Sequence, residues 1–425
     1  MIPLTATRSL EDWLTWMESL HPREIELGLD RVRAVRDRLD LSSPPFTIVT
    51  VGGTNGKGST VAMLTRIWHD AGYRIGAYTS PHLLTFHERI RIGDRLATDS
   101  DLCEAFGRVE QARGDIPLTY FEFGTLAALD LFRKQRIEIA VLEVGLGGRL
   151  DAVNVWEADV AIVTSVGTDH QDWLGTDREQ IGYEKAGIFR PGQCAVCGDP
   201  HPPQSLLSHA RDIGARLHCL NRDFEIDTAD HAWSWHRGGK VLSGLPYPAM
   251  RGEYQLHNAA CVLMALDCLA DRWPVTMANI RVGLTQAVLP GRFQTLPGYP
   301  RQVLDVAHNV EAAEALAHTL VAQTLAGTTY AVCAMLRDKP MADVARCLAP
   351  HITHWHIAGL DLPRGASVEV LHAALEQAGV AAVTEHPDIE SAYRAALSQA
   401  GPDDRVLVFG SFHTVGVILR VLPTP

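Results

Sequence analysis

A glycine-rich stretch that contains a lysine, VGGTNGKGST at residues 51–60, has the residue types that bind phosphate. It follows the apolar run FTIVT, and an amphipathic pattern, STVAMLTRIWHDAG, comes after it. Gly52 and Gly53 permit a tight turn, and the backbone N–H groups of a helix that starts near Lys57 would point at one anion. The alternative is a glycine turn beside a solvated lysine. The order of strand, GTNGKGST and helix favours a nucleotide site.

A magnesium ion at this site needs other ligands, because Gly58 stands where the common P-loop pattern has a metal-binding hydroxyl. Three candidates each follow an apolar run, namely Ser80, Glu143 and His170. The carboxyl ends of parallel strands share one edge of a sheet, where we expect these side chains to gather. Hydroxyl and carboxylate oxygens suit Mg²⁺ better than imidazole does. Each residue also has a structural explanation. Ser80 could cap a turn, Glu143 could be a paired acid, and His170 could hydrogen-bond to a loop carbonyl.

The elements that would position these residues alternate along the chain. From residue 46, apolar strand-like runs alternate with amphipathic helix-like runs, which predicts an α/β fold with a mostly parallel sheet. A polar, turn-rich span at about residues 200–248 predicts antiparallel strands or an insertion. The Pro- and Gly-rich stretch PGRFQTLPGYP precedes a second alternation, so we expect a boundary between residues 289 and 300. The predicted domains are residues 1–293 and 294–425.

Composition excludes several partner classes. The chain has 425 residues, 46% of them hydrophobic, and a net charge of -12, which argues against a nucleic-acid backbone as the main partner. We find no signal-peptide pattern and no apolar run near the roughly 20 residues of a membrane helix. The sequence therefore predicts a soluble, cytoplasmic protein without a membrane partner.

The eight cysteines are scattered, which argues against a disulfide framework. Cys194 and Cys197 form a CxxC pair after a Pro-Gly turn. No second Cys or His pair follows closely in the sequence to complete a zinc site. We interpret both as cysteines packed in a strand.

Eight segments, in order, resemble the folate branch of the Mur ligase family, from about Trp13 to the C-terminus. They are GTNGKGST, TSPHL, LEVGLGGRLDAVN, TSVGTDHQDWLG, EKAGIFRPG, PGRFQ, LDVAHN and VFGSFHTV. The family's loop is similar to GTNGKGS, so Gly58 fits it. The resemblance implies a P-loop ATPase domain followed by a smaller Rossmann-like α/β domain. It also implies an ATP-dependent amide ligase: a substrate carboxylate attacks the γ-phosphate, and the amine of glutamate displaces phosphate from the acyl phosphate.

The resemblance also implies ATP and two magnesium ions as ligands. Ser80 and Glu143 would bind one ion, and His170 and Lys185 the other. Lys185 would act as a carbamate, in which captured CO2 turns the amine into an anionic oxygen ligand; from the residues alone it reads as a helix-surface lysine. The implied catalytic residues are Lys57, His170 and Lys185. The implied nucleotide-binding residues are Asn55, Gly56, Lys57, Gly58, Ser59, Asn258, Arg292 and Asp305.

The implied substrates are dihydropteroate, reduced folates and L-glutamate. We expect the enzyme to be a monomer. About 50 residues precede the phosphate loop, too few for the extra nucleotide-sugar domain of peptidoglycan ligases. A flat pterin suits stacking on Phe121 and hydrogen bonds from Glu122 or Asp151, although Tyr120 and Phe121 also read as a packed helix start. The implied pteroate-binding residues are Glu26, Leu27, Gly28, Thr119, Tyr120, Phe121, Glu122, Leu150, Asp151 and Ala152. Those for glutamate are His308, Ser411 and His413, each of which could instead be a cap or a hydrogen-bonded histidine.

Three other functions compete with this interpretation. A P-loop hydrolase or kinase would need only the phosphate loop and Glu143. A dinucleotide-binding oxidoreductase would rest on Gly145, Gly147 and Gly148, a weak signal because no helix obviously begins there. A binding module without activity is disfavoured because every charged member of the proposed site is present. Residues 333–340 are similar to the family's M-x-x-D-K-D segment but end in Pro340, and we assign them no role.

Overall fold

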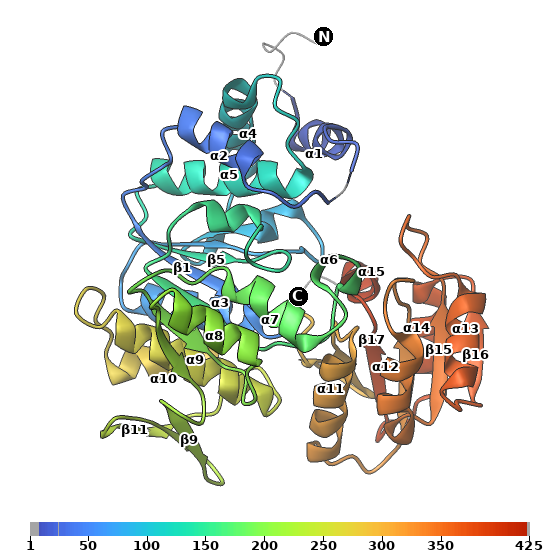
Figure 1. Ribbon diagram of the computed structural model, residues 1–425. Helices are drawn as coiled ribbons and strands as arrows, with labels where there is room; N and C mark the ends of the chain where they lie inside the picture. Colours follow the sequence, from blue (N-terminus) through green and yellow to red (C-terminus); the bar gives the residue numbers. More distant parts are fainter. Residues whose placement is uncertain (1–7, 24, 423–425) are drawn as a thin grey trace. The chain divides into compact units, whose positions relative to one another are not determined.

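The computed structural model describes residues 8–23 and 25–422, which form two compact units. The first unit contains the chain up to residue 166, residues 172–247 and residues 257–287. The second contains residues 288 onward and two earlier segments, 167–171 and 248–256. Figure 1 shows both units with their element labels.

The first unit is built on an eight-stranded, mostly parallel sheet of order β4-β3-β2-β5-β1-β6-β7-β8. The parallel strands are β1 (Thr47–Gly52), β2 (Ile75–Tyr78), β5 (Ile139–Glu143), β6 (Val160–Val163), β7 (Cys194–Cys197) and β8 (Arg216–Cys219). The short strands β3 (Ile90–Ile92) and β4 (Arg95–Leu96) extend one edge in antiparallel pairing. The central strands are buried along their whole length because helices cover both faces of the sheet.

Helices of the first unit divide between the two faces of the sheet. One face, with Ile48, Leu142 and Val163, belongs to a continuous apolar core shared with residues of α5 and its neighbours. The helices of that core are α1 (Leu10–Ser19), α2 (Asp30–Arg38), α4 (Asp99–Arg113), α5 (Tyr120–Lys134), α7 (Arg178–Ala186) and α8 (Gln204–Asp212). The remaining long helices are α3 (Lys57–Asp70), α9 (Tyr254–Cys268) and α10 (Met277–Gln286). Short helices are η1 (Phe86–Arg89), η2 (Ala152–Val155) and α6 (Gln171–Leu174).

The polar span at residues 200–248 ends in a three-stranded antiparallel sheet, as predicted. Its strands are β9 (Glu225–Thr228), β10 (Trp233–Arg237) and β11 (Lys240–Leu245). Among the residues described, no helix is long and apolar enough to cross a bilayer.

The second unit has a six-stranded sheet of order β12-β13-β17-β14-β15-β16. All neighbours pair in parallel except β12 with β13, so the predicted α/β fold with a mostly parallel sheet is confirmed. The strands are β12 (Gln294–Leu296), β13 (Arg301–Leu304), β14 (Thr329–Cys333), β15 (His354–Ala358), β16 (Val383–His386) and β17 (Arg405–Phe409). The helices are α11 (Val310–Ala322), α12 (Met341–Leu348), η3 (Ala349–His351), α13 (Val368–Gln377), α14 (Ile389–Gln399) and α15 (Phe412–Val421).

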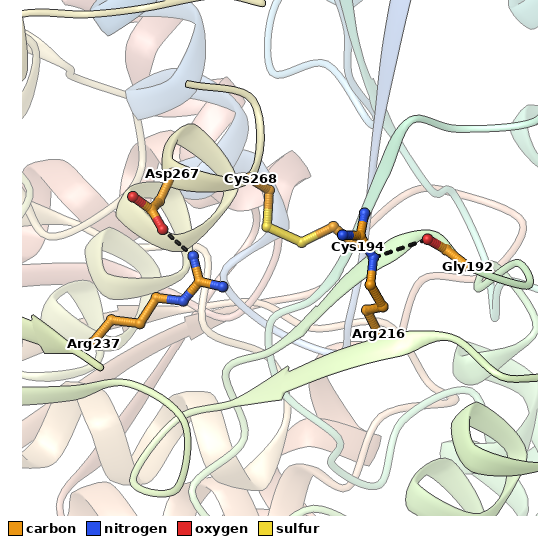
Figure 2. The surroundings of a disulfide bond; sticks show 6 residues. All are labelled: Gly192, Cys194, Arg216, Arg237, Asp267 and Cys268. Atoms are coloured by element: carbon orange, nitrogen blue, oxygen red, sulfur yellow. Dashed lines mark hydrogen bonds and ion pairs between the residues drawn. A yellow bond between two sulfur atoms is a disulfide. The ribbon is translucent and has the colours of Figure 1, made fainter. Parts of the chain in front are cut away.

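Both cysteines of the CxxC pair are buried residues of β7, as predicted, but one of them also forms a disulfide that was not predicted. Cys197 is a free, buried strand residue, as predicted, whereas Cys194 forms a disulfide with Cys268 at the end of α9. Figure 2 shows this bridge between β7 and the helix. The two cysteines are separated by 74 residues, so local spacing gave no sign of the pairing.

Candidate functional site

The glycine loop between β1 and α3 is held by hydrogen bonds to the segment that follows β6. Thr164 Oγ1 donates to the carbonyl oxygen of Asn55 at 2.6 Å, and the Thr54 N–H donates to the Ser165 carbonyl at 2.8 Å. Lys57 Nζ donates to the carbonyls of Gly53 and Thr54 at 2.9 and 3.0 Å. The lysine therefore lies over the loop, at the N-terminus of a 14-residue helix, where an anion is favoured.

Two glycines of the loop have no room for a side chain. Gly56, the N-cap of α3, has φ 86°, and a Cβ there would lie 2.3 Å from Asn258 Oδ1. A Cβ on Gly53 would lie 1.9 Å from Thr164 Oγ1. Asn258, on α9, therefore contacts the loop, so the structure brings it together with Asn55, Gly56 and Lys57.

Ser80 and Glu143 lie together at the same edge of the sheet. Glu143 is the last residue of β5 and pairs in register with Val51, immediately before the loop glycines. The Ser80 N–H donates to Glu143 Oε2 at 3.2 Å, and Glu143 is only 5% exposed. This edge thus places a hydroxyl and a carboxylate beside the phosphate loop, which is an oxygen donor set that suits Mg²⁺ or Mn²⁺.

Lys185 is buried, at 3% exposure, so the expectation of an ordinary surface lysine is wrong. It lies on α7, which begins at a capping Asp177 whose side chain accepts a hydrogen bond from the Gln180 N–H at 2.8 Å. Gly148 packs on this helix, because a Cβ there would lie 3.0 Å from the Lys185 carbonyl oxygen. Burial of an amine costs free energy that a surface position avoids, so this placement favours a role for the side chain.

The three segments predicted to bind pteroate are in contact. Arg31 of α2 joins two of them: its guanidinium is 2.5 Å from Glu26 Oε1 and 2.9 Å from Glu122 Oε1. The Gly28 N–H donates to the Leu150 carbonyl at 3.4 Å, and this hydrogen bond links the third segment to the first. The members brought together are Glu26, Leu27, Gly28, Thr119, Tyr120, Phe121, Glu122, Leu150, Asp151 and Ala152. Sequence reasoning missed Arg31, because an arginine in DRVRAVRDR is typical of a solvated helix face.

Asp151 is a buried carboxyl group in this cluster. It caps η2, since Oδ1 accepts from the Val153 N–H at 3.0 Å and Oδ2 from the Leu146 N–H at 2.8 Å. Burial raises the pKa of Asp151 to about 7, against these hydrogen bonds and the positive charge of Lys57, which lower it. Near neutral pH this carboxyl is therefore present both with and without its proton, and is able to donate as well as accept.

Aromatic rings flank the cluster. Phe121 is half-buried, its ring 5.8 Å from that of Tyr78, and a Cβ on Gly145 would lie 2.7 Å from Phe121 Cζ. The guanidinium of Arg89 lies 5.4 Å from the Tyr120 ring. Arg89 Nε also donates to His82 Nδ1 at 2.9 Å. His82 and Arg89 were missed, although His82 belongs to the quoted TSPHL segment.

His170 belongs to the second unit, together with a neighbour that sequence reasoning missed. Asp169 accepts hydrogen bonds from Lys339 Nζ at 2.6 Å and from Asn309 Nδ2 at 3.1 Å, and its carboxylate lies 3.5 Å from His308 Nε2. Burial would raise the pKa of Asp169, but His308, His170 and Lys339 together hold it well below its usual range. His170 has φ 54°, and its N–H donates to Asp169 Oδ1. Its grouping with Ser80, Glu143 and Lys185 stays a prediction.

The other predicted residues of the second unit lie around Phe412. The guanidinium of Arg292 lies 5.1 Å from this ring, and the His308 ring is 6.3 Å from it. Asp305 accepts from the N–H groups of Phe293 and Ala307, both at 2.8 Å, and its burial raises its pKa. Ser411 is the N-cap of α15 and accepts from the Thr414 N–H at 3.0 Å. The alternative explanation of Ser411 as a cap is therefore confirmed, and its contact with glutamate stays a prediction, as does that of His413.

Comparison with known proteins gives matches along nearly the whole chain. The Mur ligase middle domain matches residues 51–202, and the Mur ligase glutamate ligase domain matches residues 291–412. A dihydrofolate synthase/folylpolyglutamate synthase of Escherichia coli (strain K12) is 43% identical over 417 residues, covering 98% of this chain and 96% of the relative.

Solved structures agree with these matches. E. coli FolC in complex with DHPP and ADP has a TM-score of 0.93 and 42% identity, over 98% of each chain. A bifunctional folylpolyglutamate synthase/dihydrofolate synthase with Mn, AMPPNP and L-glutamate bound has a TM-score of 0.91 and 44% identity, over 99% of each chain. The chain described here therefore belongs to the dihydrofolate synthase/folylpolyglutamate synthase branch of the Mur ligase family.

Proposed function

We propose that this protein is an ATP-dependent ligase that joins L-glutamate to dihydropteroate and adds further glutamates to reduced folates. The observation that carries the proposal is that one unit holds both the phosphate loop with Ser80 and Glu143 and the three contacting segments predicted to bind pteroate. Arg31 joins two of these segments, and the Gly28–Leu150 hydrogen bond links the third. Relatives with DHPP and ADP, or with AMPPNP, Mn and L-glutamate, support this choice of substrates.

In this proposal the loop residues from Asn55 to Ser59 bind the ATP phosphates. Phosphate oxygens would replace the two carbonyls that Lys57 Nζ now contacts, so that its charge faces the γ-phosphate. Asn258 contacts the nucleotide from the side of Gly56. Binding of ATP by Arg292 and Asp305 stays a prediction.

Divalent cations fit the donors that are present. Ser80 and Glu143 would hold one Mg²⁺. A second ion at His170 and at a carbamate on Lys185 stays a prediction. When bound, these ions would offset the negative charge of the phosphates and the substrate carboxylate. The burial of Lys185 supports the carbamate, because a buried ammonium group is costly. The carbamate would replace this cation with an anionic ligand that a metal neutralises.

The reaction joins two substrates through an acyl phosphate. A pteroate carboxylate oxygen attacks the γ-phosphorus, ADP leaves, and the glutamate amine then attacks the acyl carbon as phosphate leaves. Phe121 would stack on the pterin, while Glu122 and Asp151 would hydrogen-bond to it. His308 and Ser411 would bind glutamate. Correct placement of the two reactants supplies much of the rate enhancement.

The remaining assignments extend this proposal. Residues 1–293 would form the ATPase and pteroate-binding domain, and residues 294–425 the Rossmann-like glutamate-ligase domain. The enzyme would act as a monomer, since one chain carries the side chains proposed for every substrate. Because the reaction consumes ATP, we place it in the cytoplasm.

The direct test mixes the purified protein with ATP, Mg²⁺, dihydropteroate and L-glutamate and identifies the product by mass. We expect dihydrofolate, with one ADP per amide bond. With tetrahydrofolate as the acceptor, we expect an added glutamate. ATP hydrolysis that does not depend on both carboxyl-bearing substrates would instead indicate a P-loop hydrolase and overturn the proposal.

The carbamate is tested with Lys185→Ala and with Lys134→Ala, an exposed lysine, as the matched control. We expect loss of about 10²–10³-fold in kcat for the first variant, because a charge-stabilising group is lost, and little change for the second. NMR with isotopically labelled bicarbonate should show a carbamate signal that only Lys185→Ala removes. A wild-type protein without this signal would exclude the carbamate.

The role of Arg31 is tested with Arg31→Gln, compared with Arg33→Gln on the same helix. Arg31 fixes Glu26 and Glu122, whereas Arg33 is an exposed partner of Asp30. We expect the KM for dihydropteroate to rise about tenfold in Arg31→Gln, because a charged hydrogen bond is worth roughly 1.5–3 kcal/mol, while the KM for ATP stays unchanged. Equal effects of the two substitutions would show that Arg31 has no special part in the pteroate pocket.

A further inference from the structure

Three side chains that bind soft metals meet between β7, β8 and the end of α9, apart from the residues of the proposed reaction. The sulfurs of Cys194 and Cys268 and a ring nitrogen of His218 all lie within 4.8 Å of one another. Strand register explains the meeting: Cys194 pairs with Arg216 and Val196 with His218, so residues 194 and 218 point to the same face of the sheet. The disulfide shows that α9 brings Cys268 to that face.

Charged side chains lie on either side of the bridge, and two of its three neighbouring cations are paired with a carboxylate. Arg237 and Lys240 both pair with Asp267, the neighbour of Cys268, and Arg216 Nε donates to the Gly192 carbonyl at 3.0 Å. Figure 2 shows the Asp267–Arg237 pair and the Arg216–Gly192 bond on either side of the bridge. Cys194 is buried at 4% exposure, whereas His218 and Cys268 are partly exposed, so an ion can reach them from solvent.

We propose that Cys194, His218 and Cys268 form a binding site for a soft divalent cation such as Zn²⁺ when the disulfide is reduced. Two thiolates and one imidazole are ligands that Zn²⁺ prefers, and water would complete the four-coordinate shell.

The disulfide and the metal complex are alternative states of the same two sulfurs. A thiol or phosphine reductant supplies two electrons, and with two protons the S–S bond becomes two thiols. The divalent cation then displaces two protons from these thiols and forms two metal–sulfur bonds. In either state, the end of α9 is attached to β7.

This site differs in place and chemistry from the proposed catalytic metal sites. Cys194 is the first residue of β7, whereas Glu143 is the last residue of β5 and Ser80 follows the carboxyl end of β2. It offers sulfur and nitrogen, whereas they offer oxygen, so an excess of Mg²⁺ would not compete for it. The proposal is therefore independent of the ligase activity.

The test uses Co²⁺ as the probe, on full-length protein reduced with a phosphine under exclusion of oxygen and freed of reductant. Excess Mg²⁺ occupies oxygen-donor sites. We expect one Co²⁺ per chain and a thiolate-to-cobalt charge-transfer band with the intensity of two thiolates. Zn²⁺ should remove the band, and protein kept in the disulfide form should not develop it.

Variants assign the ligands. Cys268→Ser and His218→Gln, both at partly exposed positions, should each weaken Co²⁺ binding by at least about tenfold, whereas Cys103→Ser, a free cysteine on α4, should not. Circular dichroism checks that each variant is folded. Reduced wild-type protein without the band would overturn the proposal. So would a band that survives Cys268→Ser but is lost in Cys197→Ser, because the buried Cys197 would then be the ligand instead.

Discussion

The parallel pairing of β1 with β5 is the constraint on which the proposed reaction site depends. This register sets Val51 opposite Glu143, so the phosphate loop and the carboxylate leave the sheet at the same edge. The pairing of β2 with β5 brings Ser80 to the same carboxylate. Three segments that are far apart in the sequence thus meet because main-chain hydrogen bonds fix their strands, before any ligand contributes.

A second set of interactions joins the segments proposed to bind pteroate. Arg31 holds Glu26 and Glu122, and Glu122 also accepts a hydrogen bond from the Thr119 N–H at 2.7 Å, in a capping box that starts α5. Asp151 likewise caps η2 while its pKa is sensitive to Lys57. Side chains proposed to bind substrate are therefore also the side chains that shape the local backbone, which keeps them in position.

Local signals in the sequence predicted much of this arrangement. The glycine loop, the strand-end positions of Ser80 and Glu143 and the alternation of strands and helices all depend on residues close in sequence. Three contacts could not be predicted from local signals, because each joins segments that are distant in the sequence. They are Arg31 with Glu122, Asp169 with Lys339, and Cys194 with Cys268. The residues alone also favoured a surface position for Lys185, which is buried, because the short α7 gives little periodicity to show which face is covered.

The central claim is that strand register places Ser80 and Glu143 as the ligands of a cation at the phosphate loop. The most direct measurement is a crystal structure with a non-hydrolysable ATP analogue and Mn²⁺, in which anomalous scattering locates the ion. We expect a peak within coordination distance of both Ser80 Oγ and the Glu143 carboxylate, next to the phosphates. A bound nucleotide whose ion contacts neither side chain would contradict the account.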